Sequence, residues 1–92
     1  MHEVALAQAI LDTVLEIADG QRPRAVRVRA GELLAVSPES LQFCFELVAQ
    51  DTAAAQAQLQ VEIVSGDALL IDAIERDDGW HHRPDVAESG VN

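Results

Sequence analysis

The sequence predicts an α+β domain in which two helices pack on a three-stranded mixed sheet, in the order helix–strand–helix–strand–strand. Residues 3–19 and 38–50 repeat apolar side chains at helical spacing. Residues 26–30, 59–63 and 68–75 alternate in the way that half-buried strands do. We therefore expect one domain over residues 1–76, followed by a flexible acidic tail over residues 77–92.

The first helix is expected over residues 3–19. Leu6, Ile10 and Val14 lie along one edge of an apolar arc that covers about half of the helix circumference, wide enough to cover a sheet. Gly20 follows the last apolar turn, and glycine is the preferred residue just after a helix end. The helix should therefore stop there.

The first strand is expected at residues 26–30, where Arg27 and Arg29 alternate with valine and alanine. These arginines should form a solvated strand face, with an acidic partner as the alternative. Gly31 should mark a bend or bulge near the end of the strand.

A second helix should begin at Ser37-Pro38-Glu39, because serine suits the N-cap, proline the first turn and glutamate the positive end of the helix dipole. Its apolar stripe contains Cys44, which we expect in the core. Phe43 flanks the stripe, so the apolar arc is broad enough to contact a second copy. We expect at most a weak homodimer, through this flank or by strand exchange.

The last two strands are joined by Ser65-Gly66-Asp67, which has the composition of a tight turn and predicts an antiparallel hairpin. The preceding strand–helix–strand unit favours a parallel pair with a right-handed crossover. In the final strand Ile74 falls out of phase with Ile71, and a bulge near Asp72-Ala73 would restore the alternation.

Composition narrows the classes of function. The chain has 92 residues and a formal net charge of −10, which disfavours nucleic acid as a partner. Its single cysteine excludes an internal disulfide and any multi-cysteine zinc site, so no zinc is expected. Neither a secretory signal nor a membrane span is expected, and the predicted location is cytoplasmic. We find no nucleophile–base pair or carboxylate pair to place in a cleft, and predict a protein that is not an enzyme.

The opening residues Met1, His2 and Glu3 are the candidate metal ligands. With histidine second, the Met1 amine and the His2 amide nitrogen close one chelate ring on a metal, and that amide and the imidazole close the next. Ni(II) accepts such square-planar nitrogen ligands, and Glu3 can offer its amide nitrogen or its carboxylate as a further ligand. A dication opposes a helix dipole, so residues 1–3 should lie outside regular helix.

Simpler interpretations remain open for these residues. His2 could be an ordinary surface histidine, and Glu3 could merely complement the helix dipole. His81 and His82, adjacent in the expected tail, could capture a metal, although such pairs are more often incidental.

These segments together resemble the HypA/HybF family, the accessory proteins that insert nickel into [NiFe] hydrogenases. The resemblance lies in the initial MHE, in VRVRAGELLAVSPESLQFCFELV and in VSGDALLIDAIE. It implies Ni(II) as the bound metal at Met1, His2 and Glu3, and delivery to the nickel GTPase HypB or to the hydrogenase large subunit. The family carries a zinc module with two Cys-x-x-Cys pairs between the second and third strands. Here that module is absent near residue 64. The alternative function is therefore a metal-independent interaction or regulatory module that retains the family's docking surface.

Overall fold

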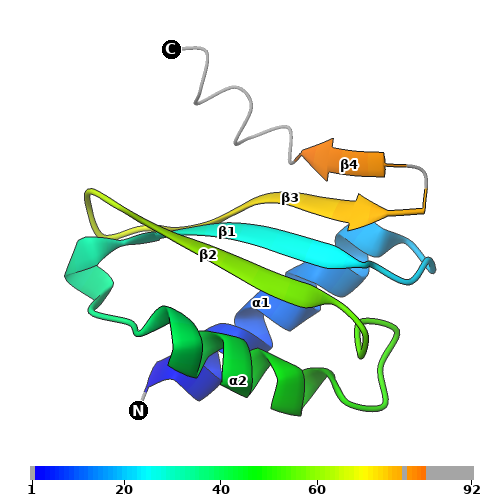
Figure 1. Ribbon diagram of the computed structural model, residues 1–92, viewed down its shortest axis with the longest axis horizontal. Coiled ribbons are helices and arrows are strands. Elements are labelled where there is room, and N and C mark those ends of the chain that lie inside the picture. The colour runs from blue at the N-terminus through cyan, green and yellow to red at the C-terminus, as the bar shows by residue number, and fades with distance from the viewer. Residues whose placement is uncertain (1, 78, 83–92) are drawn as a thin grey trace.

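A computed structural model describes residues 2–77 and 79–82, which form a sheet covered on one face by two helices (Figure 1). The helices are α1 (His2–Ala18) and α2 (Pro38–Ala49), with a short 3-10 helix, η1 (Glu32–Leu34), before α2. The strands are β1 (Ala25–Gly31), β2 (Gln58–Val64), β3 (Leu69–Arg76) and β4 (Gly79–His82). Neither described helix has the length and hydropathy that crossing a membrane requires.

The sheet is mixed, as predicted, but it has four strands in the order β2-β1-β3-β4, so the three-stranded prediction was wrong. β4 comes from residues assigned to the flexible tail, and it pairs antiparallel with β3, with Glu75 opposite Trp80. Four residues are too few to show an alternating pattern, and Gly79 with a φ of +110° permits the sharp reversal that precedes them. Residues 83–92 of the expected tail lie outside the described residues.

The predicted antiparallel hairpin between residues 59–63 and 68–75, which are β2 and β3 in the structure, was also wrong. β1 lies between β2 and β3, pairing parallel with the first and antiparallel with the second. Ser65-Gly66-Asp67 does form a bend, as expected, but it carries the chain across the end of β1. The composition of the turn correctly indicated that the chain reverses here. It contained no information about whether another strand would lie between the two strands that the turn connects.

Gly31 is needed where this connection passes over β1. The Gly31 N–H donates to the Ala68 carbonyl at 2.8 Å, and the Leu33 N–H donates to the Gly66 carbonyl at 2.9 Å. A Cβ on Gly31 would lie only 2.3 Å from the Gly66 carbonyl oxygen. The backbone of Gly31 is itself extended, with φ −63° and ψ 140°, so the bend or bulge predicted here is replaced by a close approach of two backbones.

The bulge predicted in the last strand is confirmed. The register against β1 moves from Arg27↔Ala73 to Val28↔Ile71, which leaves Asp72 as the extra residue. Ile71 and Ile74 are thereby both buried in the core. Asp72 is directed to the other face of the sheet.

Helix α1 begins at His2, so the expectation that residues 1–3 lie outside regular helix was wrong for His2 and Glu3. Glu3 stands in the first helical turn, where its negative charge complements the helix dipole and favours helix. At the other end, Asp19 and Gly20 adopt positive φ, of 52° and 85°, and end the helix. The Arg76 guanidinium donates to the Ile17 carbonyl at 3.2 Å in this last turn.

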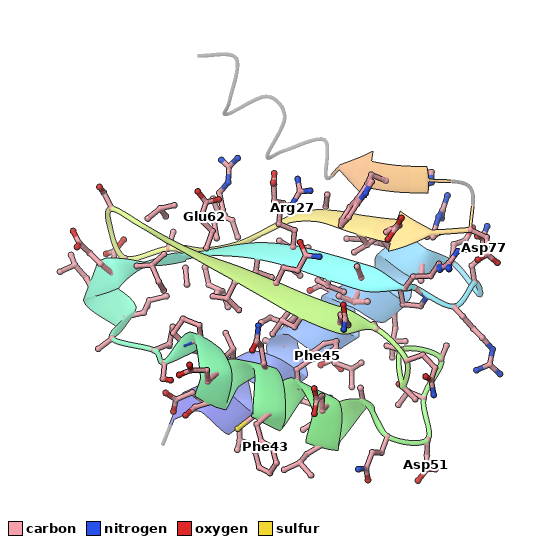
Figure 2. All side chains as sticks on the ribbon, in the orientation of Figure 1. Arg27, Phe43, Phe45, Asp51, Glu62 and Asp77 are labelled. Atoms are coloured by element: carbon pink, nitrogen blue, oxygen red, sulfur yellow. The ribbon has the colours of Figure 1, made fainter. Side chains whose placement is uncertain are left out.

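Helix α2 begins as predicted, with Ser37 as N-cap and Pro38 in the first turn. The Ser37 hydroxyl accepts the Ser40 N–H at 3.3 Å. Phe45 is fully buried between the helices and the sheet, whereas Phe43 is 61% exposed on the outer side of α2 (Figure 2). Cys44, expected in the core, is only half-buried and packs at the edge of the core.

Candidate functional site

Two of the three predicted metal ligands, His2 and Glu3, lie at the start of α1, on the helical layer of the molecule (Figure 1). Met1 falls outside the described residues, and His2 is the first residue of the helix. The first N–H groups of any helix lack acceptors within the helix. The amide nitrogens of His2 and Glu3 lie in this first turn, so binding a metal through them would break no hydrogen bond within the helix.

Glu3 connects the start of α1 to the start of α2. The Ser37 N–H donates to Glu3 Oε2 at 3.5 Å. The backbone N–H groups of Glu3 itself and of Ser37 hold the pKa of the Glu3 carboxyl below its ordinary value of 4.5. The carboxylate is therefore ionised at neutral pH, and it positions the N-terminal turn of α1 against the N-cap of α2.

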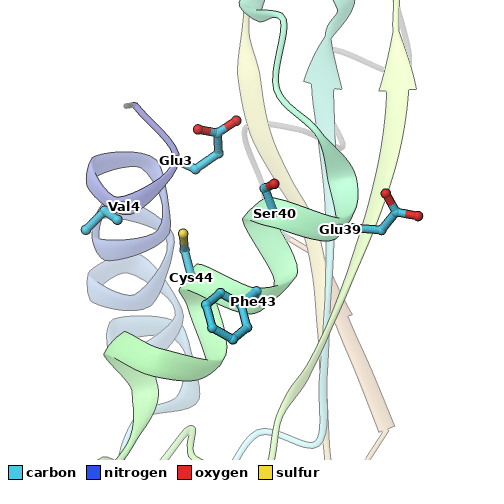
Figure 3. Close-up of a pocket in the computed structure, with 6 residues that line it drawn as sticks. All are labelled: Glu3, Val4, Glu39, Ser40, Phe43 and Cys44. Carbon is cyan, nitrogen blue, oxygen red and sulfur yellow. The ribbon is translucent and has the colours of Figure 1, made fainter.

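An open, mainly apolar hollow of about 420 Å³ lies beside this contact. Its lining residues are Glu3, Val4, Glu39, Ser40, Phe43 and Cys44. Figure 3 shows Phe43 and the Cys44 sulfur on the side of α2 near α1, whereas the Glu39 carboxylate points away from α1. This hollow was not predicted from the sequence, although the position of Phe43 outside the buried stripe of its helix was the signal that could have indicated it.

The histidines near the C-terminus belong to a different part of the fold. His81 lies in β4, where a ring nitrogen is 3.0 Å from a guanidinium nitrogen of Arg76. That arginine also bonds α1, so His81 contributes to a contact between β4 and the end of α1. Residues 2–77 and 79–82 contain no group of three or more His, Cys, Asp or Glu arranged to hold a metal. The absence of a zinc site stays a prediction.

Arg27 and Arg29 lie on the sheet face opposite the helices. One guanidinium nitrogen of each is 3.7 Å from Asp72 Oδ2. Arg29 is also 3.6 Å from a Glu62 oxygen, and the Arg27 guanidinium stacks over Trp80 at 4.6 Å from the ring centre. The two arginines are thus paired within the chain, and an acidic partner for them stays untested.

The chain is similar in sequence to proteins of one known family. A family model described as hydrogenase/urease nickel incorporation, metallochaperone, HypA matches residues 1–73. The hydrogenase maturation factor HypA of Archaeoglobus fulgidus is 41% identical over 70 residues, which are 73% of this chain and 64% of that protein. The proteins of the same name from Streptomyces avermitilis and Methanopyrus kandleri are 43% and 41% identical, over 74% and 72% of this chain.

The chain spans about half to two-thirds of the length of these relatives, whose covered shares are 64%, 55% and 49%. In this chain only residues 65–68 connect β2 to β3, so no module intervenes between those strands. The family model nevertheless covers both helices and the strands up to residue 73. The chain belongs to the HypA family of nickel-incorporation metallochaperones.

Proposed function

We propose that this protein binds Ni(II) through Met1, His2 and Glu3 and delivers it during [NiFe] hydrogenase maturation. The observation that carries the proposal is the extent of the family match, which starts at residue 1 and so includes all three residues. The recipient would be the nickel GTPase HypB or the hydrogenase large subunit. The protein would act as a carrier and not as an enzyme.

The chemistry of the three residues supports a square-planar complex. The Met1 amine, the His2 amide nitrogen and the His2 imidazole form two successive chelate rings, and Glu3 supplies the fourth ligand through its amide or its carboxylate. The amine and the imidazole must lose protons, with ordinary pKa values of about 7.7–8.0 and 6.5, so nickel affinity should fall in acid. Copper(II) would bind these ligands at least as tightly as Ni(II). Selectivity for nickel would therefore depend on which metal is available in the cell and on contacts with the partner protein.

A nickel titration with a free and a blocked N-terminus tests the proposal. The chain has no lysine, so a mild amine-directed acetylating reagent can modify nitrogen only at Met1. Acetylation should abolish tight binding, as should His2→Ala, and bound nickel should protect the amine from the reagent. Binding should also release protons and give a weak visible absorption band, typical of square-planar Ni(II).

The matched control is the double substitution of His81 and His82 by alanine, which should leave nickel affinity unchanged. If the acetylated protein binds nickel as tightly as the free protein, the N-terminal site is wrong.

A metal-independent interaction module is the second candidate. The open hollow beside Phe43 favours it, because an exposed aromatic side chain next to an apolar depression suits a protein contact. Under this alternative the protein would bind a hydrogenase maturation partner equally well with and without nickel. Capture of HypB or the large subunit in the presence and absence of a chelator distinguishes the two functions.

A further inference from the structure

Strand β2 forms one edge of the described sheet, and its backbone orientation can be assigned residue by residue. The Gln58 N–H donates to the Arg24 carbonyl at 3.1 Å, so the peptide groups of Gln58 face β1. Successive residues of a strand direct these groups to opposite sides. Leu59, Val61 and Ile63 therefore direct their N–H and C=O groups outward, away from β1.

A contact with α2 agrees with this assignment. The Gln42 side-chain amide of α2 donates to the Leu59 carbonyl at 2.9 Å, from outside the sheet. Farther along the same edge Ile63 is 44% exposed, a large fraction for an isoleucine in a strand. The outer edge thus combines outward-facing backbone groups with exposed apolar surface, and such an edge is a template for another strand.

The sequence of β2 is complementary to itself when reversed about Val61. In an antiparallel pair centred there, Leu59 faces Ile63 of the second strand on the helical side of the sheet, and Gln60 faces Glu62 on the other side. Apolar side chains therefore meet apolar ones, and each carboxylate meets an amide instead of another carboxylate. Glu62 is also near its own Arg29, at 3.6 Å, which reduces its repulsion of a second acidic chain.

The hydrogen-bonding pattern fits the same register. In an antiparallel ladder every second pair of opposite residues exchanges both backbone hydrogen bonds. With Val61 opposite Val61, those pairs are Val61 with itself and Leu59 with Ile63, which are the residues whose backbone groups face outward. The Leu59 carbonyl can keep the bond from Gln42, since a carbonyl oxygen accepts two hydrogen bonds.

We propose that two copies of this protein associate by pairing their β2 strands antiparallel about Val61, which joins the two sheets into one. This surface differs from the outer flank of α2 and from strand exchange. Each chain carries a formal charge of −10, so added salt should strengthen the association by screening the repulsion between copies.

Equilibrium sedimentation of the metal-free protein over a range of concentrations and salt tests the surface. Ile63→Lys should raise the dissociation constant about tenfold or more, because it removes two apolar cross-strand pairs and places a charge on the edge. Phe43→Lys is the matched control, since it makes the same charge change at an exposed position on α2. The proposal is overturned if wild-type protein stays monomeric at millimolar concentration, or if Phe43→Lys disrupts the dimer and Ile63→Lys does not.

Disulfide trapping tests the register and does not depend on how Ile63→Lys folds. In a Cys44→Ser background, Val61→Cys should form a dimer with oxidised glutathione, because opposed residues in a hydrogen-bonded pair lie about 5.5 Å apart between Cα atoms. Ile63→Cys should not, since residues 63 of the two copies would be about 13 Å apart along the strands. Trapping at 63 and not at 61 would refute this pairing.

Discussion

Gly31 and Glu3 each hold two segments of the chain together at a single point. At Gly31 the backbone of β1 lies against the connection that follows β2, with no room for a side chain. At Glu3 a carboxylate near the start of the chain receives the N–H that opens α2. Both contacts join segments more than thirty residues apart in the sequence.

Gly31→Ala should destabilise the fold by about 3 kcal/mol, the upper end of the usual cost of forcing extra atoms into a packed site. The new Cβ would lie 2.3, 2.5 and 2.7 Å from three backbone atoms of Gly66 and Asp67, and backbone cannot move aside as a side chain tip can. Chemical denaturation measures the loss. Gly20→Ala is the control: its Cβ would have nothing within 4 Å, and only the φ of +85° should cost about 1 kcal/mol. Equal losses for both variants would contradict the close-approach explanation.

Glu3 should make stability depend on pH in the acid range. Its pKa is lowered in the folded protein by the N–H groups of Glu3 and Ser37, so its contribution is present above the ordinary value of 4.5 and is lost as pH falls through the folded value. Glu3→Gln should therefore be less stable than wild type at pH 7, and the two should converge in strong acid. Thermal unfolding of both proteins from pH 7 to pH 2 measures this, and a stability difference that does not change with pH would rule it out.

Among the secondary-structure elements, those with strong local signals were predicted well. Ser37-Pro38 fixes the start of α2, and the phase change between Ile71 and Ile74 indicated the bulge at Asp72. β4 could not be recognised, because four residues that include two histidines and a glycine have no period to detect. The alternation in residues 59–63 identified β2 as a strand, but periodicity does not reveal that it forms an edge.

The candidate metal ligands could be proposed from the sequence, because their chemistry depends on neighbouring residues. The tertiary contacts around them could not be predicted in this way. The ligand spacing in Met1, His2 and Glu3 is a property of adjacent residues, which a sequence displays directly. The contact between Glu3 and Ser37 depends on how α1 and α2 pack, and so does the hollow beside Phe43. Tertiary packing brings these residues together, and no local pattern encodes it.

Trp80 should anchor β4 to the open face of the sheet through its stack with Arg27. Trp80→Ala should lower the free energy of unfolding by about 0.5–1 kcal/mol, the usual contribution of such a stack at an exposed site. Urea unfolding followed by circular dichroism measures the loss. Arg24→Ala is a suitable control, because the 3.8 Å ion pair of Arg24 with Asp77 is largely exposed and should contribute little. A Trp80→Ala protein as stable as wild type would mean that this stack contributes nothing to the stability of the fold.

For the molecule as a whole, the connection of β2 to β3 by residues 65–68 means that the core closes without an inserted module. The core consists of side chains from both helices and from β1, β2 and β3, with Phe45, Ile10 and Leu41 among the largest that are fully buried. These three side chains are apolar and offer no atom that could bind a metal.

Removing zinc should therefore leave the stability of the protein unchanged. A structural zinc site needs a closed set of four ligands, whereas Cys44 lies in α2 and His81 and His82 lie in β4, in a different part of the fold. Thermal unfolding before and after treatment with a strong chelator should coincide. Stoichiometric zinc that survives dialysis, together with unfolding by the chelator, would show that a site exists.

The central position of β1 also determines when the sheet can form. Both neighbours of β1 follow it in the chain, β2 after a whole helix and β3 later still. Before residue 58 is synthesised, Val26 and Val28 have no partner strand, and the extensive native contact between the elements already made is that of α1 with α2. Pairing between such distant segments requires the closure of long loops, which slows folding relative to a helical bundle of equal size. On the ribosome, the nascent chain should therefore keep its central strand unpaired until most of the domain has emerged.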